Sequence, residues 1–212
     1  MDKFLIVDDH PVVLDGLRLL LSDLLPGGEF ITANSGRKAM AMADRNPDLD
    51  WIFMDVNLPD ADGIDLLRQL ESRQSTAYVV VLSSDNSPAI ADRALNQSAS
   101  GFLSKSFDQP ELRRCIRTIE RGQIYLDADL RLELNNYRES VLAEKKHIEA
   151  SLTQRQRQTL LYLAQGYSNR EIAKSFDVTE STVKSHVQAL MALFEADNRT
   201  HCVSEAGRLN II

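Results

Sequence analysis

The chain has 212 residues, of which 43% are hydrophobic and 26% charged, a composition typical of a folded globular protein with one or two domains. No apolar run reaches the roughly 18 residues that a membrane-spanning helix needs, and the first apolar run is too short for a signal peptide, so we expect a cytoplasmic protein that does not enter a membrane. The formal net charge of −7 argues against indiscriminate binding to nucleic acid.

The charge is distributed unevenly along the chain. Residues 1–125 carry 13 basic and 19 acidic groups, whereas residues 151–212 carry 7 basic and 6 acidic groups. This difference predicts two domains, and the near-neutral end of the chain is compatible with a small DNA-reading module. Cys115 and Cys202, the only two cysteines, fall in different predicted domains, so we expect no disulfide. The four histidines are scattered, which predicts no structural zinc site.

In the first 122 residues, short apolar runs alternate with segments of helical periodicity, which is the pattern of β-α-β units in a parallel sheet. The sequence therefore predicts a doubly wound α/β domain of the flavodoxin-like type, with five parallel strands. The expected strands are 4–7, 30–33, 51–54, 78–82 and 101–103. The expected helices are 13–24, 36–46, 64–71, 90–96 and 110–121.

Residues 123–150 are expected to form a partly helical linker. The spacing of its apolar side chains allows a short coiled-coil seam, but fewer than the usual three to four heptads are present, which favours packing against a domain. These apolar side chains are Leu130, Leu134, Tyr137, Val141 and Ile148.

Residues 151–212 are predicted to be entirely helical. Thr153 and Ser168 are suited to cap the starts of helices, and Gly166 is suited to end one. A very short turn separates the second and third helices, which is the arrangement of a helix-turn-helix. The expected helices are 154–165, 169–176 and 180–194.

Three carboxylates follow neighbouring strands of the predicted sheet. Asp8 and Asp9 come directly after the first strand and Asp55 ends the third, and these strands are adjacent in this topology. Because like charges so close repel, we expect a divalent cation, and carboxylate ligands completed by water suit Mg²⁺. Ser83 and Lys105 follow the fourth and fifth strands, which places a hydroxyl and an ammonium group in the same crevice. An aspartate in such a pocket can accept a phosphoryl group.

Each of these residues alone has an ordinary structural explanation. A single aspartate after a strand is usually a turn or helix-cap residue, Ser83 alone would be a turn hydroxyl, and Lys105 alone would be a solvated charge. Only their joint spacing indicates a site. His10 is expected to be an ordinary loop residue.

These motifs resemble the receiver domain of response regulators, and the similarity covers nearly all of residues 1–122. In that family an acidic pair follows the first strand, the acceptor opens an Asp-x-x-x-Pro-x-x-x-Gly loop, a Ser or Thr follows the fourth strand, and a Lys follows the fifth. This chain has a permitted residue at each position: Asp8, Asp9, Asp55 with Pro59 and Gly63, Ser83, and Lys105.

The resemblance implies a role for each matched residue. Asp55 is the expected phosphoacceptor, Ser83 and Lys105 are expected to contact the phosphoryl group, and Phe102 is expected to act as an aromatic switch. The ligands that the resemblance implies for Mg²⁺ are Asp8, Asp9, Asp55 and the main-chain carbonyl of Asn57.

The stretches Leu152-Thr153, 163–173 and 179–186 closely resemble the LuxR-type helix-turn-helix of the NarL/FixJ class, and the similarity spans about 55 residues. The third helix is polar over its first turns, as a helix entering the major groove must be, and Val183 is expected to lie in the core rather than contact a base. By resemblance, the residues expected to face the groove are Lys184, Ser185 and Gln188. The residues expected to contact the DNA backbone are Asn169, Arg170 and Thr182.

The chain also departs from the LuxR-type pattern. The family commonly has Glu where Gln156 stands, and a basic pair near Ala192 and Leu193, where this chain has none. Each lost phosphate contact weakens binding and its salt dependence. We therefore expect modest affinity for a single domain and a need for dimerisation.

The resemblance as a whole implies a two-component response regulator that is not a turnover enzyme. Its expected partners are a sensor histidine kinase or a small phosphodonor, double-stranded DNA, and a second copy of the chain once activated. The expected domains are a receiver (1–122), a linker (123–150) and a DNA-binding domain (151–212). One alternative is a degenerate regulator that binds proteins without phosphorylation. Another is a magnesium phosphatase, but such enzymes need Asp-x-Asp after the first strand, and Asp8-Asp9-His10 does not provide it.

Overall fold

The computed structural model describes residues 2–73 and 75–212 of the chain. They form two compact units, one extending to Asn135 and the other running from Asn136 to Ile212. The division falls inside the segment expected to be a linker, and the finer domain bounds remain predictions. None of the described helices is both long and apolar enough to cross a membrane.

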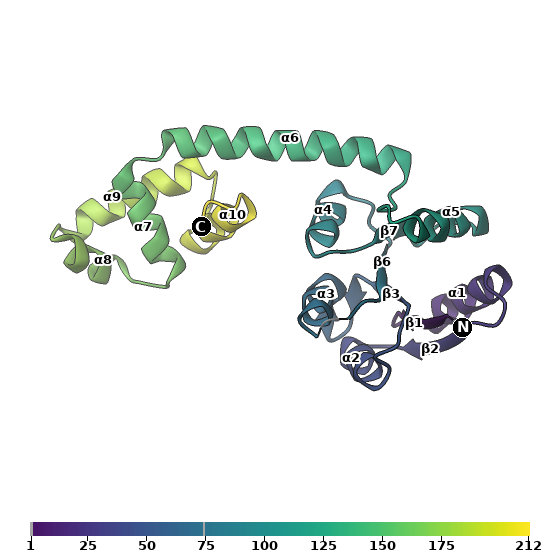
Figure 1. Cartoon of the computed structure of the whole chain (residues 1–212). Coiled ribbons are helices and arrows are strands. Elements are labelled where there is room, and N and C mark those ends of the chain that lie inside the picture. The colour runs from purple at the N-terminus through teal and green to yellow at the C-terminus, as the bar shows by residue number, and fades with distance from the viewer. Residues whose placement is uncertain (1, 74) are drawn as a thin grey trace. The chain divides into compact units, whose positions relative to one another are not determined.

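The first unit is built on a five-stranded parallel sheet (Figure 1). Its order is β2-β1-β3-β6-β7, so β1 lies between β2 and β3, as expected for a doubly wound sheet. The predicted fold class is therefore confirmed. The strands are β1 (Lys3–Val7), β2 (Glu29–Ala33), β3 (Trp51–Asp55), β6 (Tyr78–Ser83) and β7 (Gly101–Ser104).

Five helices cover the two faces of this sheet. Figure 1 shows α1 (Pro11–Leu24) and α5 (Gln109–Glu120) on one face. The other face carries α2 (Gly36–Arg45), α3 (Gly63–Ser72) and α4 (Pro88–Asn96). Burying one large apolar side chain contributes roughly 1.5–3 kcal/mol to stability. Because a shift of one strand against its neighbours would expose several of these side chains, the core on each face fixes the alignment of the strand ends. The core between the sheet and α1 and α5 includes Phe4, Phe53, Leu21, Leu112 and Ile119.

A short hairpin follows the third strand of the sheet. It consists of β4 (Asn57–Leu58) and β5 (Ala61–Asp62), paired antiparallel. The sequence analysis expected only a loop here, because strands of two residues are too short to show alternation of apolar and polar side chains. The hairpin returns the chain from Asp55 to the start of α3.

The linker segment is mostly one helix, α6 (Ala128–Ser151). Leu130 and Leu134 near its start are buried within the first unit, and Ile148 near its end is buried in the core of the second unit. These side chains thus pack within the chain, which is the alternative that their spacing favoured over a coiled-coil seam.

The second unit contains four further helices: α7 (Gln154–Ala164), α8 (Asn169–Phe176), α9 (Glu180–Leu193) and α10 (Arg199–Arg208). The predicted caps are confirmed, since Thr153 forms a capping box with Gln156 and Ser168 forms one with Glu171. Gly166 has φ of 85°, a left-handed conformation that suits glycine at a helix end. The sequence analysis did not delimit α10, whose buried face has small side chains and so little apolar periodicity.

Candidate functional site

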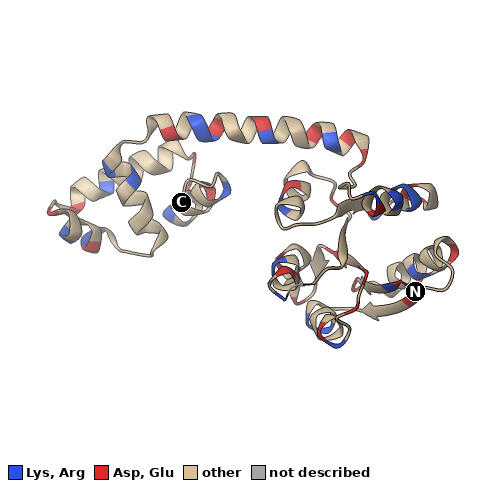
Figure 2. Cartoon of the chain, in the orientation of Figure 1, with Lys and Arg blue, Asp and Glu red and all other residues tan. Residues whose placement is uncertain are grey.

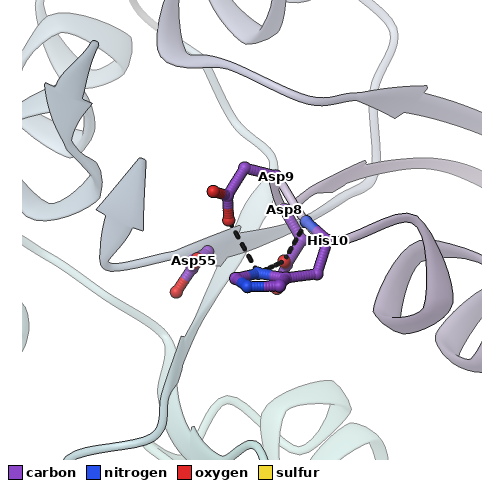
Figure 3. A group of neighbouring side chains, drawn as sticks. All are labelled: Asp8, Asp9, His10 and Asp55. Atoms are coloured by element: carbon purple, nitrogen blue, oxygen red, sulfur yellow. Dashed lines mark hydrogen bonds and ion pairs between the residues drawn. The ribbon is translucent and has the colours of Figure 1, made fainter. Parts of the chain in front are cut away.

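The carboxyl ends of β1 and β3 bring three carboxylates together. The two strands pair in parallel with Val7 opposite Met54, so the residues that follow them, Asp8 and Asp55, are neighbours. Asp8 is 0% exposed and Asp55 is 1% exposed. Asp8, Asp9, His10 and Asp55 each offer one ligand atom, and these atoms all lie within 4.8 Å of one another (Figure 3). The predicted convergence of the three carboxylates is therefore confirmed.

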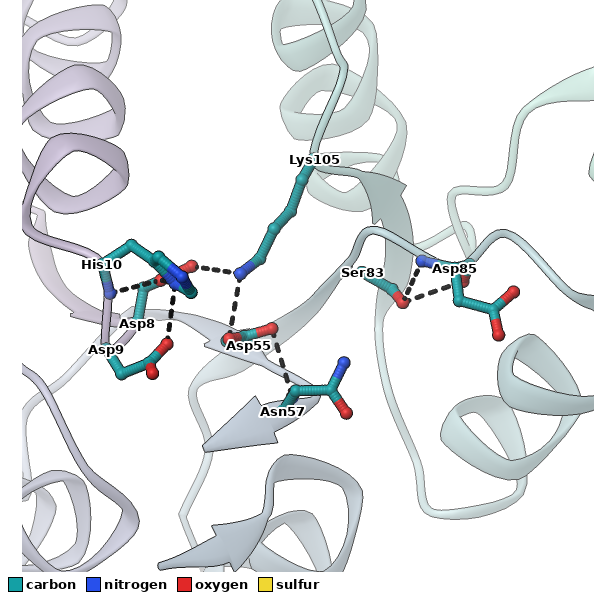
Figure 4. A network of polar contacts seen from close by, with 8 residues as sticks. All are labelled: Asp8, Asp9, His10, Asp55, Asn57, Ser83, Asp85 and Lys105. Carbon is teal, nitrogen blue, oxygen red and sulfur yellow. Dashed lines mark hydrogen bonds and ion pairs between the residues drawn. The ribbon is translucent and has the colours of Figure 1, made fainter. Parts of the chain in front are cut away.

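Lys105 places its ammonium group between two of these carboxylates. It follows β7, and its backbone N–H donates to the Ser83 carbonyl at 2.8 Å. Its Nζ lies 2.6 Å from Asp8 Oδ2 and 2.9 Å from Asp55 Oδ2 (Figure 4). The expectation that Lys105 points into the crevice is met, and its charge offsets part of the repulsion between the carboxylates.

Two opposing effects set the pKa values of Asp55 and Lys105: burial disfavours the charged form of each group, and the ion pair between them favours it. Burial raises the pKa of Asp55 above its ordinary value, and contact with Lys105 and the Asn57 N–H only partly offsets that effect. For Lys105, burial lowers the pKa, but contact with Asp8 and Asp55 outweighs it, so the net shift is upward. Lys105 therefore stays charged, whereas the ionised form of Asp55 is held in an environment that disfavours it.

The residues of this pocket fit a divalent cation. Asp8 Oδ2, Asp9 Oδ1 and Asp55 Oδ2 are buried and accept no well-formed hydrogen bond from the described residues, although Lys105 and His10 make ion-pair contacts with them. One ammonium group does not balance three carboxylates. Because carboxylate oxygens with open positions for water are the ligands that Mg²⁺ prefers, the donor set suits that ion.

Three further residues predicted to take part in the switch are Asn57, Ser83 and Phe102. The Asn57 N–H donates to Asp55 Oδ1 at 3.2 Å. The Ser83 hydroxyl is buried, but it donates to the Asp85 carbonyl at 2.8 Å and accepts from the Asp85 N–H at 3.0 Å. In this unphosphorylated structure the hydroxyl is thus bonded within its own loop (Figure 4), and its contact with a phosphoryl group stays a prediction. Phe102 is 1% exposed in β7, and its N–H donates to the Tyr125 carbonyl.

The loop after Asp55 is fixed by close packing and by helix capping. A Cβ at Gly63 would overlap the Asp55 carbonyl, so the chain can pass this close only with glycine at that position. Asp62 caps α3 through the Ile64 N–H and pairs with Arg93 of α4 at 2.7 Å. This close approach is a tertiary contact, so the Asp-x-x-x-Pro-x-x-x-Gly pattern alone does not reveal it.

Two functional contacts were missed from sequence. Asp60 accepts hydrogen bonds from the Gly36 and Arg37 N–H groups at 2.7 and 3.1 Å, which ties the acceptor loop to the start of α2. Both bonds lower the pKa of Asp60. His10 lies in the acidic pocket itself, and its position directly after Asp8-Asp9 was the available signal.

In the second unit the predicted DNA-reading residues lie on α8 and α9. Val183 is fully buried, so its expected place in the core is confirmed. The Ser185 hydroxyl donates to the Ser181 carbonyl, and the Thr182 hydroxyl is 2.9 Å from that of Thr179. Asn169 is partly buried, and the other predicted contacts are exposed: Arg170, Thr182, Lys184, Ser185 and Gln188. Figure 2 marks both basic (blue) and acidic (red) residues on helices of both units.

Comparisons with known proteins agree with both halves of this description. Residues 4–117 match the family described as response regulator receiver domain, and residues 150–206 match bacterial regulatory proteins of the luxR family. The chain belongs to the response regulator family. Its combination of a receiver with a LuxR-type helix-turn-helix is that of the NarL/FixJ class, whose members are DNA-binding regulators. These matches do not favour the alternative of a degenerate protein-binding regulator.

Individual relatives extend along the whole chain. The response regulator protein VraR of Staphylococcus aureus is 30% identical over 214 residues, covering 99% of this chain and 98% of VraR. The glycerol metabolism activator of Pseudomonas putida is 29% identical, covering 99% of this chain and 97% of that protein. Among solved structures, the RcsB response regulator of Salmonella typhimurium has a TM-score of 0.57 at 21% identity, covering 97% of this chain and 98% of RcsB, which shows likeness of fold.

Proposed function

We propose that this regulator is switched by phosphorylation of Asp55. The observation that carries the proposal is the pocket in which Asp8, Asp9, Asp55 and Lys105 converge at the carboxyl ends of the parallel strands. A buried carboxylate beside an ammonium group and a cation site has the surroundings that phosphoryl transfer to aspartate requires. The donor is a sensor histidine kinase or a small phosphodonor.

Each residue of the pocket has its own role in the proposed transfer. Asp8, Asp9, Asp55 and the main-chain carbonyl of Asn57 hold Mg²⁺, which when bound supplies positive charge against the phosphoryl oxygens. An oxygen of Asp55 attacks phosphorus, a P–O bond forms as the P–N bond to the donor breaks, and the leaving nitrogen takes a proton from solvent. Lys105 stabilises the negative charge that the phosphoryl group brings. The chain thus accepts the group in cis and does not turn over an external substrate.

Ser83 and Phe102 carry the signal away from the pocket. In the structure the Ser83 hydroxyl donates its proton to the Asp85 carbonyl, so it must break that hydrogen bond to donate to a phosphoryl group on Asp55. Such a movement rearranges the end of β6 next to β7, where Phe102 is packed. Repacking of Phe102 then changes the receiver surface. In this way a local change of charge at Asp55 alters the surface that the receiver presents to its partners.

The output is binding to double-stranded DNA by a homodimer in the cytoplasm. Lys184, Ser185 and Gln188 on exposed positions of α9 face the major groove, and Asn169, Arg170 and Thr182 contact the backbone. Two half-sites a helical turn apart double the contact surface, which offsets the absence of a basic pair at Ala192 and Leu193. RcsB, which shares the fold, has been solved in complex with DNA.

The decisive test compares three proteins treated with Mg²⁺ and phosphoramidate. The wild type is expected to gain the mass of one phosphoryl group and to bind DNA fragments more tightly. Asp55→Asn is expected to gain neither, because the nucleophile is lost. Asp65→Asn, which changes an exposed aspartate in the same region, is the matched control and should behave as the wild type. A phosphoryl group found on Asp55→Asn would overturn the assignment of the acceptor.

A further inference from the structure

The ring of His10 lies directly against the carboxylates of the acidic pocket. Its Nδ1 is 2.8 Å from Asp9 Oδ1 and 3.1 Å from Asp8 Oδ1. Figure 3 shows the ring beside both carboxylates, with the Asp55 carboxylate close by. The imidazole thus belongs to the same cluster of ligand atoms as the three aspartates.

The local backbone holds the ring in this place. The His10 N–H donates to Asp8 Oδ1 at 2.9 Å, so main chain and ring are both tied to that carboxylate. Pro11 follows and opens α1, which restricts His10 to an extended conformation, observed as φ of −95° and ψ of 112°. Although His10 is the N-cap residue of α1, its side chain makes no capping hydrogen bond with the described helix, so it is available to the pocket.

His10 occupies the solvent side of the pocket and Lys105 the inner side. The side chain of His10 is 68% exposed, whereas that of Lys105 is 14% exposed. Lys105 contacts the Oδ2 atoms of Asp8 and Asp55, and His10 contacts the Oδ1 atoms of Asp8 and Asp9. A cation entering from solvent therefore meets the imidazole together with Asp9 Oδ1, a buried oxygen with no well-formed hydrogen bond from the described residues.

An imidazole nitrogen changes which cations such a pocket prefers. Carboxylates, carbonyls and water suit Mg²⁺, whereas imidazole favours first-row transition ions over Mg²⁺. We propose that His10 supplies a nitrogen ligand to the acidic pocket and makes it bind first-row transition cations with a preference for imidazole, such as Co²⁺, more tightly than Mg²⁺. This inference rests on the proposed function, because the aspartates that hold Mg²⁺ are the same ones that His10 contacts.

The test is cation binding to the full-length, unphosphorylated chain, measured by titration calorimetry with Mg²⁺ and with Co²⁺. His10→Gln keeps an N–H donor near the carboxylates but removes the imidazole. It is expected to lower the affinity for Co²⁺ at least about tenfold while leaving the affinity for Mg²⁺ within about twofold. His147→Gln, which changes an exposed histidine of the second unit, is the matched control and should leave both affinities unchanged.

Pulsed electron paramagnetic resonance of the Mn²⁺-loaded protein gives a direct readout of the nitrogen ligand. Wild type and His147→Gln are expected to show imidazole nitrogen coupling to Mn²⁺, and His10→Gln is expected to lose it. If His10→Gln weakens Co²⁺ and Mg²⁺ equally and the wild type shows no nitrogen coupling, His10 only orients the carboxylates and the inference is overturned. Failure of the wild type to bind either cation would overturn the proposed magnesium pocket as well, which separates the two failures.

Discussion

The two units of this regulator place their functional residues in opposite ways. In the first unit the site is buried, and its members Asp8, Asp55 and Lys105 are separated by 47 and 50 residues in sequence and brought together by the strand order. In the second unit most of the proposed site is exposed along one helix, α9, with Lys184, Ser185 and Gln188 within a single turn or so. The difference teaches that the receiver chemistry depends on tertiary packing, whereas the DNA-reading surface depends mainly on helix periodicity.

The largest expected effect tests whether the two units are independent in stability. Leu190 of α9 is fully buried in the second core, and Leu190→Ala is expected to cost about 2–5 kcal/mol of unfolding free energy because a cavity remains. Hydrogen exchange should show lost protection of amides after Asn136 only. Leu161→Ala, at a position 46% exposed, is the control and should cost less than about 0.5 kcal/mol. Equal loss of protection in the receiver would mean that the units unfold together.

The next effect tests the packing of the acceptor loop. Gly63→Ala places a Cβ against the Asp55 carbonyl, and displacing this backbone is expected to cost about 1–3 kcal/mol and to slow phosphoryl uptake. Gly16→Ala is a matched control, because a Cβ at this helical position meets nothing within 4 Å. It is expected to stabilise the first unit by about 0.5–1 kcal/mol in denaturant unfolding. A neutral Gly63→Ala would show that the loop has room to relax.

A smaller effect divides the DNA-reading surface into its two proposed classes of contact. Arg170→Ala is expected to weaken binding to all DNA sequences alike and to reduce the salt slope by about one per half-site, because a phosphate contact is lost. Gln188→Ala is expected to cost about 1–3 kcal/mol at one base position and to relax specificity there. Fluorescence anisotropy over a salt series with a set of single-base variants measures both. If Arg170→Ala relaxed specificity and Gln188→Ala weakened binding to all sequences alike, the roles assigned to these two residues would be reversed.

The smallest effect uses the two cysteines as probes of their units. Burial raises the pKa of Cys115 to about 12 and that of Cys202 to about 11, so neither thiol is ionised near neutral pH. Both are expected to resist Ellman's reagent in the native chain and to react fully in denaturant. Rapid native labelling of Cys202 alone would show that the second unit opens more readily than the first.

Much of the fold could be predicted from the sequence, but several contacts could not. Each of the five expected strands is present, and Thr153, Ser168 and Gly166 mark helix ends, because these signals act within a few residues. The apolar side chains of the hairpin after Asp55 and of helix α10 show too little periodicity for the bounds of these elements to be predicted. The contacts of Asp60 with Gly36 and Arg37 join residues more than 20 positions apart, so no local pattern encodes them.

By itself the sequence determined the order of the main strands and helices, the acidic residues that end the first and third strands, and the polar face of α9, since covalent spacing and side-chain periodicity set all three. Only the tertiary structure decided that Lys105 bridges Asp8 and Asp55 and that His10 turns toward Asp9. These contacts depend on how closely separate strand ends approach. That approach is fixed by the packing of the core rather than by any neighbouring residue in the chain.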